Sequence, residues 1–307
     1  MKYIILGGNG FIGSYIVDIL VEKGHEVTIF DRGSEKFRNS LSNVNYVYGN
    51  IDDHDLIKEN FREKDILIHC VSTTVPFTSN NNMEFDIKSN LINSVKIFRI
   101  ACEQNIKRII YLSSGGAIYG ETEIMPITED SQTNPISSYG ITKLAIEKYL
   151  AYFSSNYGIE YNIIRPSNPY GPRQNPFGNQ GVISVFLGKV LRNESIEVWG
   201  DGEIAKDYVF IEDLAESIYE ASVSQKTSQI FNIGSGTIIS INEIINTIKE
   251  VTKEDLIVNY YPTNKFDVQH FCLDIEKAKN ILNFKPKVNL KEGISLTWEF
   301  VKSLKEK

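Results

Sequence analysis

Nearly continuous runs of Ile, Val, Leu and Tyr recur through the first half of the chain, separated by longer segments of mixed polarity. A short apolar run with little alternation is typical of a strand that is buried on both faces of a parallel sheet. The runs therefore predict six strands, at residues 2–8, 26–31, 44–49, 65–72, 108–114 and 161–166.

The segments between these runs repeat an apolar residue every three or four positions, which indicates amphipathic helices. The first carries Ile12, Ile16, Ile19 and Leu20 on one face and ends at Gly24, a residue type that commonly terminates helices. The alternation predicts an α/β protein with a Rossmann-type, doubly wound parallel sheet. Further helices are predicted at residues 83–103, 139–156, 181–192 and 212–222.

The pattern changes at Pro166, where prolines begin to punctuate a segment rich in Asn and Gly. This composition is typical of a domain border. Short strands are predicted at residues 196–199 and 229–234, and we expect the second to return to the main sheet. We therefore predict two domains, a larger one of residues 1–165 plus about 207–235 and a smaller, mixed α/β one of residues 166–206 plus 236–307.

The composition of the 307 residues is ordinary for a folded protein, with 42% hydrophobic and 23% charged residues. A net charge of −7 argues against a nucleic-acid partner. No apolar run approaches the roughly 18 residues of a membrane span. The three cysteines are far apart, so we expect neither a disulfide framework nor a metal site. The first residues read as a strand and not as a signal peptide, and we expect a cytoplasmic location.

A glycine-rich turn, formed by Gly7, Gly10 and Gly13, joins the first predicted strand to the first predicted helix. Such a turn lets a pyrophosphate approach backbone N–H groups at the positive end of a helix. Asp31 ends the second strand, where a carboxylate accepts hydrogen bonds from the adenosine ribose and repels a 2′-phosphate. The sequence therefore predicts NAD rather than NADP, a preference that the neighbouring Arg32 weakens because it could hold a phosphate.

Tyr139 and Lys143 lie four residues apart at the start of a predicted helix and therefore share one of its faces. A phenol is a poor base near neutral pH, but an adjacent positive charge favours the phenolate. Beside a bound nicotinamide, the pair can take a proton from an alcohol or return it. With the glycine turn upstream, it predicts an enzyme that oxidises or reduces alcohols.

These features, with Ser113-Ser-Gly-Gly-Ala-Ile-Tyr-Gly and Arg165-Pro-Ser-Asn-Pro-Tyr-Gly-Pro, resemble the extended short-chain dehydrogenase/reductase family and, within it, the nucleotide-sugar epimerases. The resemblance runs nearly end to end. It implies an NAD-dependent 4-epimerase of UDP-hexoses in which Tyr139 takes the proton of the sugar 4-hydroxyl. Lys143 then binds the nicotinamide ribose and lowers the pKa of Tyr139.

The resemblance also implies a wider set of cofactor contacts. Asn50 replaces the Asp that is usual in the adenine pocket, and Asn90 matches an asparagine that steadies the active-site strands in the family. The cofactor-binding residues predicted in addition to the glycines and Asp31 are Phe11, Ile12, Arg32, Asn50, Ile51, Val71, Ser72, Asn90, Ser113, Tyr139, Lys143 and Pro166.

One position departs from the family pattern. The third catalytic residue of the family, a Ser or Thr, falls on Gly115. The adjacent Ser114 is our candidate, but neighbours on a strand point to opposite faces, so it can serve only if the strand end twists. Otherwise Thr73, Thr74 or water holds the sugar 4-oxygen. The acidic residues that related dehydratases and decarboxylases use are replaced by Gly and Ala after Gly115, which favours epimerisation without elimination.

For the nucleotide-sugar, the resemblance implies a contact from Asn168 to the diphosphate and N–H groups at a helix start. It also implies an aromatic side chain packed on the base and a lysine where Arg is usual. The predicted substrate-binding residues are Thr73, Ser114, Asn168, Gly181, Val182, Trp199, Lys206 and Lys265. Two other interpretations remain open for two of them: Trp199 as plain core and Lys265 as a solvated side chain.

Two alternatives to an epimerase stay open. One is a net oxidoreductase, either a reductase of NDP-4-ketohexoses or a dehydrogenase that releases the keto sugar. The other is a non-catalytic dinucleotide-binding protein that kept the fold. By analogy with the family we expect a homodimer that pairs the helices at 83–103 and 139–156, with Leu91, Val95, Phe98, Leu150 and Phe153 as core or interface. We also expect a role in polysaccharide synthesis.

Overall fold

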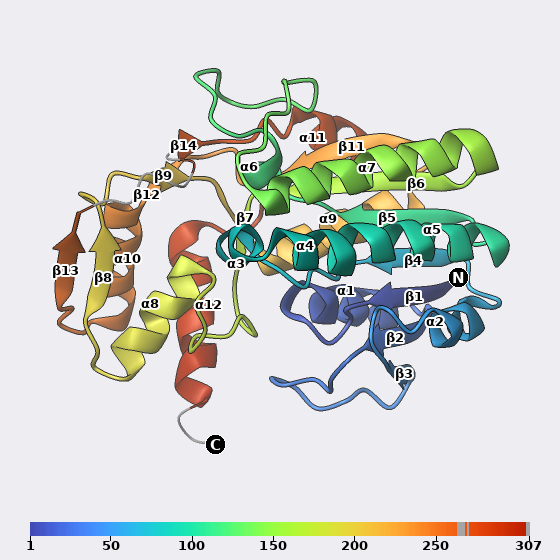
Figure 1. Cartoon of the computed structure of the whole chain (residues 1–307). Helices are drawn as coiled ribbons and strands as arrows, with labels where there is room; N and C mark the ends of the chain where they lie inside the picture. Colours follow the sequence, from blue (N-terminus) through green and yellow to red (C-terminus); the bar gives the residue numbers. More distant parts are fainter. Residues whose placement is uncertain (263–267, 269, 305–307) are drawn as a thin grey trace.

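A computed structural model describes residues 1–262, 268 and 270–304 of the chain. Its centre is a parallel sheet of seven strands in the order β11-β6-β5-β4-β1-β2-β3 (Figure 1). All six predicted strands are present, and the predicted strand at 229–234 does return to this sheet, beside β6. The strands are β1 (Lys2–Leu6), β2 (Glu26–Asp31), β3 (Val44–Tyr48), β4 (Ile66–His69), β5 (Arg108–Leu112), β6 (Glu160–Pro166) and β11 (Gln229–Ile233).

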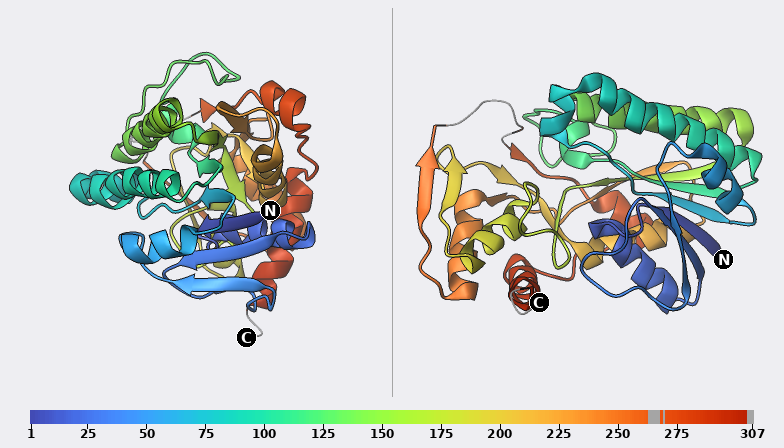
Figure 2. Two further views of the ribbon diagram at one scale, coloured as in Figure 1. Left: turned by 90° about the vertical axis from the view of Figure 1, so that its right-hand side faces the viewer. Right: turned by 60° about the horizontal axis from the view of Figure 1, so that its bottom comes forward.

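Helices cover both faces of the sheet, as the alternation of strand and helix predicts (Figure 2). On one face α1 (Phe11–Glu22) packs beside α9 (Ile211–Val223). The other face carries α2 (His54–Phe61), α5 (Asn93–Glu103) and α7 (Ser138–Tyr157), which bury a second hydrophobic cluster against the strands. The Rossmann-type fold predicted from the sequence is therefore confirmed.

The helix predicted at 83–103 is divided into three consecutive segments. It begins as α4 (Met83–Asp86), continues as a π-helical stretch, η1 (Ile87–Ile92), and ends as α5. An amphipathic pattern does not distinguish a widened turn from an α-helical one, so the π-helical stretch could not be predicted. Short π-helical insertions are frequent at functional sites.

Most of the elements after β6 form a smaller body at one end of the sheet, on the left of Figure 1. In this body α12 packs against α8 and α10, and β8 pairs with β13. By contrast, α11 packs on α9 and β11 of the large sheet. The elements are β7 (Asn168–Tyr170), α8 (Val182–Leu191), β8 (Ile196–Trp199), β9 (Ala205–Lys206), β10 (Tyr208–Phe210), β12 (Ile239–Ser240), α10 (Ile241–Thr252), β13 (Val258–Tyr261), β14 (His270–Phe271), α11 (Glu276–Leu282) and α12 (Leu290–Ser303).

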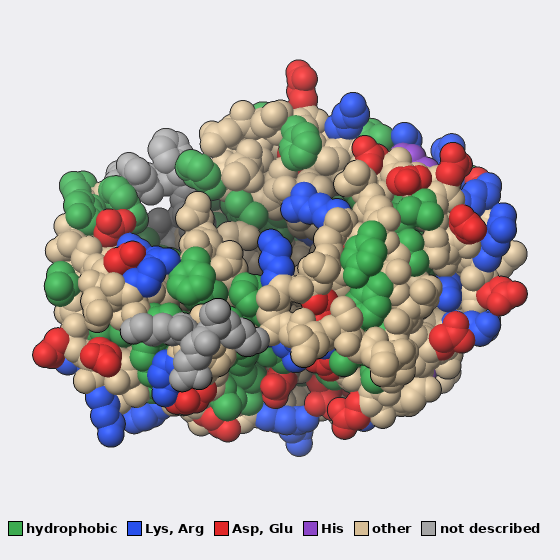
Figure 3. Space-filling model, turned by 90° about the horizontal axis from the view of Figure 1, so that it is seen from below, with side chains coloured by type: hydrophobic (Ala, Val, Ile, Leu, Met, Phe, Trp, Pro, Cys, Tyr) green, Lys and Arg blue, Asp and Glu red, His purple; other side chains and the backbone are tan. Residues whose placement is uncertain are grey.

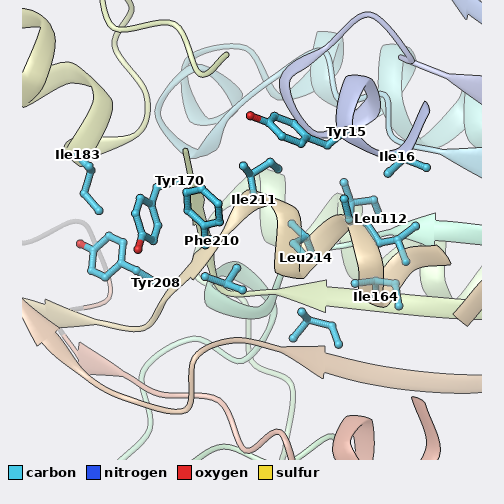
Figure 4. Packing of buried hydrophobic residues seen from close by; sticks show 14 of the residues in the cluster. Tyr15, Ile16, Leu112, Ile164, Tyr170, Ile183, Tyr208, Phe210, Ile211 and Leu214 are labelled. Atoms are coloured by element: carbon cyan, nitrogen blue, oxygen red, sulfur yellow. The ribbon is translucent and has the colours of Figure 1, made fainter. Parts of the chain in front are cut away.

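One hydrophobic cluster joins the two bodies (Figure 4). It runs from Leu112 and Ile164 on the sheet through Leu214 on α9 to Tyr170 and Ile183 in the smaller body. The division of the chain into two domains at the predicted boundaries stays a prediction.

The face of the molecule seen in Figure 3 intersperses acidic and basic side chains among apolar ones. Within the described part of the chain, no helix combines the length and the apolar character that crossing a membrane requires.

Candidate active site

A cavity of about 710 Å³ opens where the carboxyl ends of β1, β4, β5 and β6 face the smaller body. The first strand lies between β4 and β2, so the chain leaves β1 and β4 in opposite directions at this edge. Ligands of open α/β sheets bind at such a switch point. The predicted site residues that line the cavity are Gly7, Gly10, Phe11, Ile12, Gly13, Ser72, Ser113, Ser114, Tyr139, Lys143, Pro166, Asn168, Gly181, Val182, Trp199 and Lys206.

The glycine turn fits a pyrophosphate. Gly7 has φ of +85°, which side chains other than hydrogen rarely tolerate. A Cβ on Gly13 would collide with the carbonyl oxygen of Gly7, so the strand and α1 approach as closely as they do only with glycine there. Gly10 precedes α1 and no side chain caps this helix end. Its first N–H groups are thus left to a ligand on the cavity side.

The predicted adenosine contacts adjoin this turn. A second cavity of about 270 Å³ shares Gly10 and Phe11 with the first and is lined by Asp31 and Arg32. The carboxylate of Asp31 accepts hydrogen bonds from the backbone N–H groups of Asn9 (3.1 Å) and Gly33 (3.4 Å). This fixes the carboxylate at the end of β2, where the ribose of a dinucleotide is expected.

Four predicted contact residues lie outside both cavities. Val71 packs with its side chain against Gly7, and Ile51 packs on the core cluster under α2. Asn50 is exposed just beyond β3. Asn90 is buried, and its amide is bonded to the N–H of Thr73 and to other protein groups. Asn90 therefore anchors the loop after β4 without facing the cavity, and its role in steadying the active-site strands stays a prediction.

Tyr139 lies in the first turn of α7, which three side chains hold in place. Ser137 caps Gly140, Ser79 accepts a hydrogen bond from the N–H of Tyr139, and Asn80 accepts one from Ser138. The last two belong to α3 (Pro76–Asn81), a short helix in the loop after β4. Satisfying these N–H groups fixes the start of the helix. The position of Tyr139 is therefore set by a loop some 60 residues earlier in the chain.

Lys143 lies one turn further along the same face of α7. Its side chain is only 4% exposed, and its ammonium donates a hydrogen bond to the carbonyl oxygen of Leu112 (2.9 Å). The Nζ atom is 5.7 Å from the centre of the Tyr139 ring. The predicted pair thus meets in the cavity, with its cation anchored to the end of β5.

Burial raises the pKa of Tyr139 to about 12, and the nearby carboxylate of Asp86 adds to the rise. Hydrogen bonds with the hydroxyl groups of Ser114 and Ser72 act in the opposite direction. Burial also lowers the pKa of Lys143 to about 8. We expected the Lys143 ammonium to lower the pKa of Tyr139. In the structure the two serine hydroxyls are the groups that do so, because they are in hydrogen-bond contact with the phenol.

The structure also explains the missing hydroxyl at Gly115. A Cβ at this position would lie 2.7 Å from Cδ1 of Leu273 and 2.9 Å from the carbonyl oxygen of Pro166, so it faces packed protein. Strand β5 has already ended at Leu112, and the rule of alternating faces does not extend to Ser114. Ser114 precedes the short helix α6 (Gly115–Ile118) without capping it through its side chain, and its hydroxyl meets Tyr139 in the cavity.

The other residues considered for the sugar 4-oxygen are occupied elsewhere. The hydroxyl of Thr73 bonds to Ser89 (2.6 Å), and that of Thr74 bonds to Asp86 (2.5 Å). Neither residue lines the cavity. Ser113 does line it, but its hydroxyl donates to the buried carboxylate of Glu147 (2.6 Å). Ser72 also lines the cavity beside Tyr139, but its hydroxyl donates to the carbonyl oxygen of Thr74 (3.0 Å), so Ser114 is the candidate hydroxyl for the sugar 4-oxygen.

The substrate side of the cavity is made by the smaller body. Asn168 is fixed by two hydrogen bonds, from its N–H and its Nδ2, to the carbonyl oxygen of Asp207 (3.1 and 3.0 Å). Trp199 is 53% exposed and lies against Tyr261, with ring centres 5.2 Å apart, so it is not plain core. Lys206 lies on β9 at the wall. Lys265 lies outside the described residues.

Several cavity residues carry no signal in the sequence. Gln174 is held by Ser184 and by the carbonyl oxygen of Pro169, in a loop without periodicity. Other residues come from separate elements that only the fold brings together. The lining residues that were missed include Cys70, Pro76, Ser167, Tyr170, Gln174, Gln180, Glu197, Ile204 and Tyr208. Among residues 1–262, 268 and 270–304, no cluster of three His, Cys, Asp or Glu side chains could hold a metal ion.

The glycine turn, the carboxylate after β2 and the Tyr139–Lys143 pair in one cavity define a dinucleotide-dependent enzyme of the short-chain dehydrogenase type. The chain belongs to the NAD dependent epimerase/dehydratase family, whose sequence model matches residues 3–234. The predicted enzyme class and the NAD cofactor are thereby confirmed.

Individual relatives cover the chain nearly end to end. It is 31% identical over 311 residues to a UDP-glucose 4-epimerase of Mycolicibacterium smegmatis, a match that covers 99% of both proteins. The fold is similar to the crystal structure of a Thermotoga maritima UDP-glucose 4-epimerase with UDP-glucose, at 35% identity, a TM-score of 0.95 and 99% coverage of both chains. A Thermus thermophilus UDP-glucose 4-epimerase in complex with NAD is 29% identical, with a TM-score of 0.92 and coverage of 98% and 99%.

Proposed function

We propose that this enzyme is an NAD-dependent nucleotide-sugar 4-epimerase that acts on UDP-hexoses. The observation that carries the proposal is the placement of Tyr139, Lys143 and Ser114 in one cavity, between the glycine turn and the substrate wall. The names of the relatives support the same activity. A 4-epimerase needs a base, a hydroxyl that positions the sugar oxygen and a dinucleotide, and this cavity can supply a place for each.

Side chains of the cavity transfer the proton and orient the sugar. Tyr139 takes the proton from the sugar 4-hydroxyl and gives it back to the 4-oxygen once the keto sugar has turned its other face. The Ser114 hydroxyl holds that oxygen beside Tyr139 and, with Ser72, lowers the pKa of the phenol, while Lys143 holds the nicotinamide ribose. Bound NAD would be held by the glycine turn and Asp31 and would supply the acceptor, and then the donor, of the C4 hydride. Neither oxidant nor reductant is consumed.

A label at C4 separates this reaction from net oxidation or reduction. UDP-galactose that carries deuterium at C4 is incubated with the enzyme and added NADH, and the product is examined by proton NMR and mass spectrometry. We expect UDP-glucose that keeps the deuterium at C4, because the hydrogen leaves and returns within one turnover. Dilution of the label by the added NADH would instead favour the alternative of a reductase or a released keto sugar.

We further propose that the enzyme is a cytoplasmic homodimer that serves polysaccharide synthesis. Of the helices expected to pair, α7 exposes Ile141, Tyr149 and Tyr152, and η1, which adjoins α5, exposes Ile92. Exposed apolar side chains on two helices that pack together support an interface. Phe98, Leu150 and Phe153 are buried in the core of the single chain and are not available for it. Sedimentation equilibrium would test the dimer, which Tyr149→Glu with Tyr152→Glu should weaken.

A further inference from the structure

A carboxylate without a cation is buried beside the catalytic pair. Asp86, the last residue of α4, is completely buried. Its Oδ1 atom accepts hydrogen bonds from the hydroxyl of Thr74 (2.5 Å) and the amide of Asn90 (2.9 Å). Its Oδ2 atom accepts them from the hydroxyls of Ser138 (2.7 Å) and Thr142 (2.8 Å). All four donors are neutral groups.

The other buried carboxylate near the pair is held differently. Glu147 forms a bidentate ion pair with Arg165. The Nη2 and Nε atoms of Arg165 donate to the two carboxylate oxygens at 2.6 and 3.0 Å, and both side chains are 3% exposed. A buried charge is costly unless an opposite charge compensates it. Among the residues that the structure describes, Asp86 has no ion-pair partner. Its negative charge is therefore left to act on its surroundings.

The positions of its donors show what Asp86 connects. Ser138 immediately precedes Tyr139, and Thr142 immediately precedes Lys143. Thr74 belongs to the loop that carries Ser72, whose hydroxyl is in hydrogen-bond contact with Tyr139. One carboxylate thus joins the first turn and a half of α7 to the loop after β4, and these two segments form one wall of the cavity.

We propose that Asp86 is a positioning residue of this site, which fixes Tyr139 and Ser72 through its four hydrogen bonds and keeps Lys143 in its ammonium form through its buried charge. Asp86 does not line the cavity, so it does not touch the substrate and acts only through the residues of the wall that it holds. The kinetic part of this proposal rests on the proposed function.

The charges around Lys143 support this assignment. Burial lowers the pKa of Lys143, while Cys70, then Glu147 and then Asp86, in decreasing order, act to raise it. The pKa of Cys70 is itself raised to about 12 by burial, so this thiol is neutral near pH 7. The negative charge of Glu147 is compensated by its ion pair with Arg165. Asp86 is left as the uncompensated negative charge that favours the ammonium.

The remaining groups that face Lys143 are uncharged near neutral pH. Burial lowers the pKa of His69 to about 3 and raises that of Tyr111 well above its ordinary value, so both are neutral. The same is true of Tyr139. By element, the titratable groups around the ammonium are His69 and Cys70 at the end of β4, Asp86 on α4, Tyr111 on β5, and Tyr139 and Glu147 on α7.

The test is Asp86→Asn, which keeps the shape and can keep the hydrogen bonds, because hydroxyl groups both donate and accept. Asp86 raises the pKa of both Tyr139 and Lys143. Removing the charge should lower both pKa values, so both limbs of the pH–rate profile should move to lower pH, by about one unit for a close charge. A purely structural role would lower the rate at every pH and leave the limbs in place.

A second measurement does not require turnover. Competitive acetylation with acetic anhydride, read by mass spectrometry of the α7 peptide, reports the protonation of Lys143 as a function of pH. We expect the labelling midpoint to fall by about one pH unit in Asp86→Asn, with the exposed Lys148 on the same helix unchanged as the internal control. A shifted labelling midpoint in an enzyme without epimerase activity would contradict only the proposed function. An unchanged labelling midpoint in an active enzyme would contradict only the proposed role of Asp86.

Two further variants separate charge from hydrogen bonding. Thr142→Val keeps the charge and deletes one hydrogen bond, so it should lower the rate without moving the midpoint. The double variant Glu147→Gln with Arg165→Met deletes the compensated pair and should also keep the wild-type midpoint. This double variant decides the question even if Asp86→Asn does not fold, because a large fall of its midpoint would assign the countercharge to Glu147 and overturn the proposal.

Discussion

Replacing Ser114 with Ala should slow epimerisation by about 10- to 100-fold while the fold and the bound NAD are kept. The hydroxyl of Ser114 is one of the two that lower the pKa of Tyr139 through a hydrogen bond. A hydrogen bond to a charged group contributes about 1.5–3 kcal/mol. Each 1.36 kcal/mol of barrier is a factor of ten in rate, and the expected loss follows directly.

Gly115→Ser is the matched control for this substitution. It puts a hydroxyl at the position where the family pattern expects one, but the new Cβ would lie 2.7 Å from Leu273 and 2.9 Å from the Pro166 carbonyl oxygen. Overpacking of this kind costs about 1–3 kcal/mol of stability. We therefore expect Gly115→Ser to be less stable in urea unfolding and the double variant Ser114→Ala with Gly115→Ser to remain slow.

The assay is kcat for the conversion of UDP-galactose, followed by proton NMR, with the NAD content of each variant measured after denaturation. Recovery of the wild-type rate in the double variant would show that the hydroxyl acts from position 115 and would refute the reasoning. A near-normal rate for Ser114→Ala alone would refute it as well.

Three further substitutions test other parts of the site. Tyr139→Phe should lower kcat by about 10²–10⁴-fold with NAD still bound, because it removes only the proton-transfer group, and near-normal turnover would contradict its role. Lys206→Ala should raise the KM for the nucleotide-sugar more than it lowers kcat, because Lys206 lines the substrate side of the cavity; an unchanged KM in steady-state kinetics would contradict this contact. Arg165→Met should destabilise the protein by about 3–5 kcal/mol in urea unfolding, because it leaves Glu147 buried without its cation, and wild-type stability would show that the ion pair is not needed.

The sheet was predictable because strands buried in a parallel sheet have continuous apolar runs in their sequence. The ends of two strands were not. We expected strands to continue to Ser72 and Ser114, but β4 ends at His69 and β5 at Leu112. Beyond these points the chain turns over the cavity, and small residues that suit a strand suit such a turn equally well. The turn is what brings Ser72 and Ser114 to Tyr139.

The site was predictable where its residues are close in sequence. The glycine turn and the Tyr139–Lys143 pair are local patterns with a direct chemical meaning. Asp86 was not recognisable, because its role depends on hydroxyl groups 52 and 56 residues away on another helix. Gln174 is another example, since its place in the wall depends on the irregular segment after β7.

The most direct test of the central claim uses the purified enzyme without added cofactor. It is incubated with UDP-galactose, UDP-N-acetylgalactosamine and UDP-galacturonate in turn, while the sugar protons are followed by NMR and NADH by its absorbance. A 4-epimerase that keeps its NAD converts at least one of these sugars to its 4-epimer with no lasting NADH. A single burst of NADH without an epimer, or no change in any of the three sugars, would contradict the proposed function.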